Sequence, residues 1–74
     1  MKTASSHWRI LGRNVARLRN VAELSQERLA ERAEVHPRFL QKIEAGQANP
    51  SLAVLVRLRS GLGCAWQELL RGVG

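Results

Sequence analysis

Hydrophobic residues recur along the chain at steps of three and four positions, which is the spacing of one face of an α-helix. The first run predicts a helix from about His7 to Val21, with an apolar face formed by Trp8, Leu11, Val15, Leu18 and Ala22. Residues 1–6 precede this run and are mostly polar, so we expect a flexible N-terminal tail there.

Two short helices are predicted next. Ser25 is a favourable N-cap, because its hydroxyl accepts a backbone N–H that has no partner within the helix. The inward face of this helix comprises Leu29, Ala30 and Ala33. The following helix begins near His36-Pro37, since proline fits the first helical position. It ends at Gly46 with a left-handed C-cap, and its inward residues are Leu40 and Ile43, with Val35 just before them.

Two further helices complete the pattern. One follows Asn49-Pro50-Ser51 and carries Leu52, Leu55, Leu58 and Leu62. The other covers about Ala65 to Leu70. Five short helices with short connections predict an all-α fold that forms a single domain over residues 1–74. Because the second and third helices are separated by only a few residues, they are expected to form a helix-turn-helix.

The net charge of the chain indicates what kind of partner it binds. Twelve Lys and Arg against six Asp and Glu give a net charge of +6, which suits a polyanion such as nucleic acid or an anionic membrane surface. The longest strongly apolar run, residues 52–56, is far shorter than the ~20 residues that cross a bilayer, so no membrane-spanning segment is predicted. Of the two possible partners we expect nucleic acid and no membrane. The single Cys64 cannot form an internal disulfide, and the N-terminus lacks the apolar stretch of a signal peptide. The expected location is the cytoplasm, at the nucleoid.

The ordered motifs from Leu11 to about Leu70 resemble the lambda-repressor-like family, also called the Cro/C1 type of helix-turn-helix protein. The resemblance is carried by Leu11-Gly12, Leu18-Arg19, Leu24-Ser25-Gln26-Glu27-Arg28-Leu29-Ala30, Val35-His36, Leu40-Gln41-Lys42-Ile43-Glu44-Ala45-Gly46, Asn49-Pro50-Ser51-Leu52 and Glu68-Leu69-Leu70. It implies a sequence-specific regulator that binds double-stranded DNA.

The resemblance also implies roles for single residues. The residues expected to read bases lie on the third helix and are Arg38, Gln41, Lys42 and His36. The residues expected to contact phosphates are Gln26, Lys42, Gln47 and Asn49. Arginine pairs in bidentate fashion with guanine and glutamine with adenine, so these side chains suit the major groove. The alternatives are that Arg38 and Lys42 form a solvated face, that Gln26 only caps a helix, and that His36 is an N-cap.

Other positions concern the scaffold. In the family, the positions of Arg19 and Glu44 form a partly buried ion pair, and we expect one here. Glu23 and Glu34 stand where the family often has glycine, so a left-handed backbone there implies strain of order 1 kcal/mol at each. Arg59 replaces a small inward residue, and we expect it either to reach the surface or to change the packing of its helix. Arg9, Arg13 and Arg17 follow four-residue steps; a solvated face is expected, with a phosphate contact as the alternative.

A homodimer on a short palindromic operator is the expected assembly, because one helix reads only a few base pairs. The predicted dimer surface is the C-terminal segment, through Trp66, Leu69, Leu70 and Val73, with closure of the monomer core as the alternative. The alternative function is an antitoxin or another protein-interaction module that binds a partner protein. An enzyme is not expected, because His7, His36 and Cys64 show no catalytic or metal-binding spacing, and no cofactor is predicted.

Overall fold

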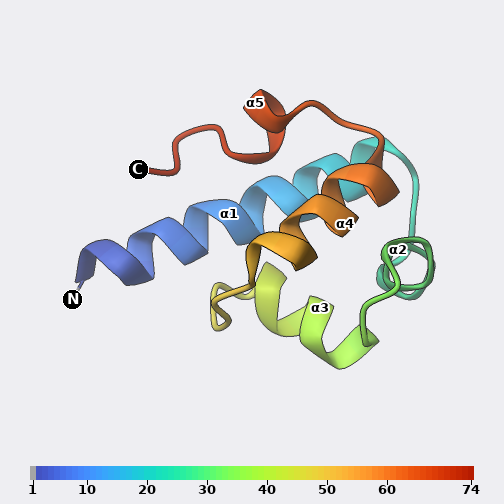
Figure 1. The fold of residues 1–74 in the computed structure, drawn as a ribbon, viewed down its shortest axis with the longest axis horizontal. Helices are drawn as coiled ribbons and strands as arrows, with labels where there is room; N and C mark the ends of the chain where they lie inside the picture. The colour runs from blue at the N-terminus through green and yellow to red at the C-terminus, as the bar shows by residue number, and fades with distance from the viewer. Residues whose placement is uncertain (1) are drawn as a thin grey trace.

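Five helices build the protein in the computed structural model, which describes the backbone of residues 2–74 and the side chains of residues 6–74. They are α1 (Lys2–Val21), α2 (Gln26–Ala33), α3 (Pro37–Glu44), α4 (Leu52–Leu62) and α5 (Trp66–Leu69). The long α1 contacts α3, α4 and α5, while α2 packs on α3 and α4 (Figure 1). Residues 2–74 contain helices and no strand, which confirms the all-α prediction.

Serine side chains cap the starts of α2 and α4; the sequence predicts the cap at Ser25 and places Ser51 directly before its helix. The Ser25 hydroxyl accepts the Arg28 N–H at 3.0 Å at the start of α2. The Ser51 hydroxyl accepts the Val54 N–H at 3.2 Å at the start of α4. The predicted start of α1 at His7 is wrong, since the helix already begins at Lys2; the flexibility expected for residues 1–6 stays a prediction.

Left-handed residues end the first three helices. Glu23 and Glu34 have φ values of 59° and 56°, so the strained backbone expected at both glutamates is present. Gly46 follows α3 with φ of 73°, and the next N–H, from Gln47, donates to the Lys42 carbonyl at 2.9 Å. This left-handed turn closes α3 at the predicted glycine.

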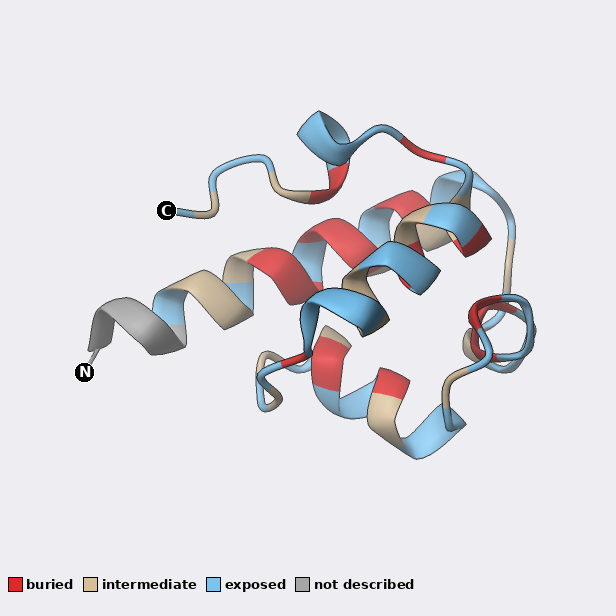
Figure 2. Cartoon of the chain, in the orientation of Figure 1, coloured by how far each residue is buried: buried red, intermediate tan, exposed pale blue. Residues whose placement is uncertain are grey.

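The core is aliphatic and lies where α1 packs on α3, α4 and α5 and where α2 packs on α3 and α4 (Figure 2). Its fully buried large side chains are Leu11, Val15, Leu29, Leu40, Ile43, Leu58 and Leu69. Leu52 belongs to the same apolar series as Leu58 in the sequence, but its side chain is 71% exposed. At 3.6 residues per turn Leu52 lies about 120° around the helix from Leu58, so the two side chains lie on different faces of α4.

Two contacts to α1 hold the rest of the chain in place. The buried Asn14 amide donates to the carbonyls of Leu69 and Arg71, at 2.9 and 2.8 Å, and so fastens the C-terminal segment to α1. Gly12 touches the C-terminal end of α3, where a Cβ would lie 2.4 Å from the Ile43 carbonyl oxygen. The position of α3 on the scaffold therefore depends on a residue without a side chain.

Candidate nucleic-acid interface

The α2–α3 pair forms a helix-turn-helix in which α3 presents its outer face to solvent. Only residues 34–36 separate the two helices. Leu40 and Ile43 point into the core and are buried, whereas Arg38, Gln41 and Lys42 are exposed. We call α3 the recognition helix, because a rigid helix with exposed polar side chains is the element that fits the major groove.

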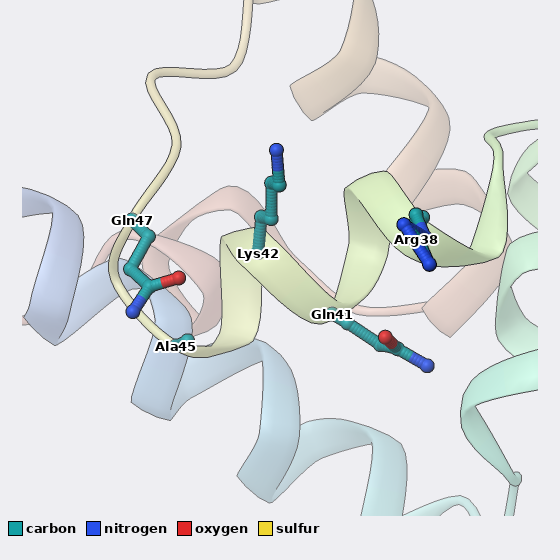
Figure 3. A pocket seen from close by; sticks show the side chains of 5 residues that line it. All are labelled: Arg38, Gln41, Lys42, Ala45 and Gln47. Carbon is teal, nitrogen blue, oxygen red and sulfur yellow. The ribbon is translucent and has the colours of Figure 1, made fainter.

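The exposed side chains of the recognition helix surround an open hollow of about 350 Å³ (Figure 3). Its lining residues are Arg38, Gln41, Lys42, Ala45 and Gln47. The first four come from α3 or its C-cap, and Gln47 comes from the turn that follows. The structure thus brings three of the four predicted base-reading residues to one surface, together with two of the four predicted phosphate contacts, Lys42 and Gln47.

His36 has a structural task at the edge of this surface. Its ring Nδ1 accepts the Arg38 N–H at 3.1 Å and so caps α3. A neutral imidazole that accepts at Nδ1 carries its proton on Nε2. The exposed His36 ring can therefore offer a donor to DNA only through Nε2.

Gln26 is joined to the scaffold in a way that the sequence did not predict. Its amide donates to Glu44 Oε1 at 2.9 Å, and the side chain is partly buried. An amide carries two N–H donors, so one donor remains for another acceptor. Asn49, the last predicted phosphate contact, is exposed in the loop between α3 and α4.

Arg19 and Glu44 form the ion pair that the sequence predicts. Arg19 Nε lies 2.7 Å from Glu44 Oε2, and a second Arg19 nitrogen donates to Oε1 at 3.1 Å. The side chains are 14% and 8% exposed, so the pair is largely removed from water. Arg19 also donates to the Leu24 carbonyl at 2.9 Å. Together with Gln26, the pair joins α1, the start of α2 and the end of the recognition helix.

The positive charges of the recognition helix are not neutralised by neighbouring carboxylates. Among residues 6–74 the ion pairs are Arg19–Glu44 and the exposed Arg28–Glu31, and neither includes Arg38 or Lys42. Unpaired cations on an exposed helix face suit a polyanionic partner.

The C-terminal segment departs from the predicted dimer surface. Leu69 is completely buried, because α5 packs on α1 through this residue, so the prediction that Leu69 contacts a second copy is wrong. Leu70 and Val73 are partly buried against the same core. Trp66 stays 36% exposed, and the Arg59 guanidinium lies 5.3 Å from its ring centroid. Arg59 is half-buried: its guanidinium faces the Trp66 ring and donates to the Cys64 carbonyl at 3.4 Å, while its Nε is buried without a hydrogen-bond partner among the described residues.

Within residues 2–74, none of the helices has the length and apolar character needed to span a membrane.

Comparisons with known proteins agree with this geometry. A family model described as helix-turn-helix matches residues 15–69. The chain is 34% identical over 62 residues to the HTH-type transcriptional regulator y4dJ of Sinorhizobium fredii, covering 84% of this chain and 80% of that protein. It is 35% identical over 65 residues to the control protein C.SmaI of Serratia marcescens, covering 88% and 77%.

A solved structure shows the same fold. The restriction-modification controller protein C.AhdI of Aeromonas hydrophila superposes with a TM-score of 0.83 at 30% identity, over 86% of this chain and 97% of that one. These relatives belong to a family of DNA-binding regulators rather than of enzymes. The chain belongs to the Cro/C1-type helix-turn-helix family and is a DNA-binding transcriptional regulator.

Proposed function

We propose that the protein regulates transcription as a homodimer that binds a short palindromic operator, with the recognition helix of each copy in the major groove. The observation that carries this proposal is the exposed face of α3, where Arg38, Gln41 and Lys42 surround one open hollow. Arg38 reads guanine and Gln41 reads adenine, since their side chains match the acceptor and donor patterns of these bases. Lys42 reads a base or holds a phosphate, and His36 adds a donor through Nε2.

Phosphate contacts fix the register of the helix in the groove. Gln47 and Asn49 follow the recognition helix and are exposed, so they contact the phosphates of the DNA strand next to the end of α3. Gln26 contributes the amide N–H that its bond to Glu44 leaves over. Gln26, the proposed phosphate contact, is thereby hydrogen-bonded to Glu44 at the end of the recognition helix, and Glu44 is paired with Arg19 of α1.

The dimer surface that we propose keeps Trp66 and adds two residues of α4. Leu52 and Val56 are 71% and 43% exposed, and they lie one turn apart on α4 together with Arg59, which faces the Trp66 ring. Their exposed apolar area forms a strip from the start of α4 to α5. A second copy is the proposed occupant, because pairing across a two-fold axis sets two recognition helices ~34 Å apart, one turn of DNA. Leu70 and Val73, which are partly buried against the core, are kept as proposed members of this dimer surface.

In the cell we propose that the protein acts in the cytoplasm, at the nucleoid, and without a cofactor. Its likeness to C.SmaI and C.AhdI supports a role as a controller of restriction-modification genes.

Selection of bound sequences from random DNA, at two salt concentrations, tests this function together with sedimentation analysis of the free protein. We expect the selection to enrich a palindrome. We expect sedimentation to give the wild type twice the mass of one chain, and Trp66→Ala the mass of a single chain. Gln67→Ala is the matched control, because this neighbour is exposed but polar. A monomeric wild type that enriches no sequence at either salt concentration would overturn the proposal.

A further inference from the structure

Two arginines of α1 lie next to its contact with the recognition helix: Arg9 touches the turn after α3, and Arg13 follows one helical turn further along α1. A Cβ on Gly46 would be 2.8 Å from the Arg9 Cα, so α1 touches the turn after α3 at Arg9. Between the two arginines, Gly12 meets the carbonyl ends of α3 at Ile43 and Glu44. Both arginine side chains are exposed, and their four-residue spacing places them on the same face of α1.

These arginines extend the cationic surface of the recognition helix. Neither forms an ion pair within residues 6–74, so both positive charges are available to a partner. Arg9 is in contact with the turn that carries Gln47, and Gln47 lines the same hollow as Lys42. A continuous basic and polar edge therefore runs from α3 across the turn to α1.

Arg17 continues the four-residue series but is held differently. Its guanidinium donates to Asn14 Oδ1 at 3.2 Å, and Asn14 itself binds the carbonyls of Leu69 and Arg71. The third arginine is therefore directed toward the C-terminal segment, away from the end of α3. The structure thus offers two residues for the site and a matched control on one helix.

We propose that Arg9 and Arg13 bind DNA phosphates next to those contacted by the turn after the recognition helix, so that α1 widens the footprint beyond the bases read. A helix in the major groove lies between two sugar-phosphate backbones, and side chains that flank its end face one of them. Arginine suits this task, because its planar guanidinium binds phosphate in bidentate fashion and is always charged. The proposal rests on the entry of α3 into the major groove.

The salt dependence of binding to a random-sequence duplex tests the proposal, because phosphate contacts are independent of sequence. Fluorescence anisotropy would give the slope of log K against log salt for the wild type and for Arg9→Ala, Arg13→Ala and Arg17→Ala. We expect the slope to shrink by ~0.9 for each of the first two variants and to stay unchanged for Arg17→Ala. Far-UV circular dichroism of each variant establishes that the fold is retained.

Three results would contradict either the proposed phosphate contacts or the proposed DNA-binding function on which they rest. Wild-type slopes in Arg9→Ala and Arg13→Ala would overturn the phosphate contacts. An equal loss in Arg17→Ala would also overturn them, because net charge alone would then explain the effect. A wild type that binds no duplex, even at low salt, would overturn the proposed function itself.

Discussion

Replacement of Gly12 by alanine tests the contact that positions the recognition helix. The new Cβ would lie 2.4 Å from the Ile43 carbonyl oxygen and 2.7 Å from that of Glu44. Carbon and carbonyl oxygen approach to ~3.3–3.6 Å in proteins, so α1 and α3 must separate by about 1 Å. The atoms in the way belong to the backbone and cannot rotate aside.

The magnitude follows from two opposing terms. Forced overpacking in a core costs about 1–3 kcal/mol, and contacts with backbone atoms place this case at the upper end. Alanine in a helix interior is favoured over glycine by about 1 kcal/mol. The variant should therefore lose about 1–2 kcal/mol of unfolding free energy, which lowers the melting temperature of a domain this small by about 5–15 °C.

Thermal unfolding followed by far-UV circular dichroism measures this loss. Arg13→Ala is the matched control, because it changes the next residue of the same helix and its side chain is exposed. The control should change the unfolding free energy by no more than about 0.5 kcal/mol. If Gly12→Ala were as stable as the wild type or more stable, helix propensity would outweigh the contact and the reasoning would fail.

Three further predictions concern single residues. Glu34→Gly should raise the unfolding free energy by about 0.5–1 kcal/mol, because it relieves a left-handed backbone, whereas Glu31→Gly inside α2 should lower it by about 1 kcal/mol. Glu44→Ala should cost about 3 kcal/mol in urea unfolding, since it leaves Arg19 largely buried without its partner; a loss as small as that of Glu31→Ala, in the exposed ion pair, would contradict this. Burial, together with the nearby Glu68 charge, raises the pKa of the Cys64 thiol. Its alkylation at pH 8.5 should be slower in the folded than in the urea-unfolded protein, and stability should fall as the pH rises above the ordinary thiol pKa; equal rates would refute the shift.

Periodicity and capping chemistry are local, and for this reason they predicted most of the fold. Ser25 and Ser51 mark helix starts through a hydrogen bond that spans only three residues, and Gly46 closes α3 by its own backbone conformation. Leu52, Leu55 and Leu58 follow three-residue steps, and each such step turns about 60° around the helix, so Leu52 lies off the buried face. The sequence pattern alone does not show which leucine of such a series is the first to be exposed.

The candidate site was predictable where it depends on one helix and less so where segments meet. The exposed face of the recognition helix follows from the spacing of Arg38, Gln41 and Lys42 around Leu40. Gln26 and Glu44 come together only in the tertiary fold, so no local sequence pattern predicts the hydrogen bond between them. A glycine in the interior of a helix did offer a signal, because Gly12 weakens α1 unless a close approach requires it.

The burial of Leu69 shows how a short helix can mislead. Apolar residues at the end of a chain serve either a second copy or the monomer core, and the sequence pattern is the same for both. The structure separates them, since Leu69 packs against α1 while Trp66 remains partly exposed. Only the residues packed around each side chain in the folded protein show whether it belongs to the monomer core or is exposed to a second copy.

Whether the outer face of α3 reads bases is tested by comparing the sequences selected from random DNA by the wild type and by Arg38→Ala. Arg57→Ala, an exposed arginine of α4, is the control. We expect Arg38→Ala to lose base preference at one position in each half of the motif and about 1–3 kcal/mol of specific binding, while Arg57→Ala keeps the motif. An unchanged motif and affinity in Arg38→Ala would show that this face of α3 does not read bases through Arg38.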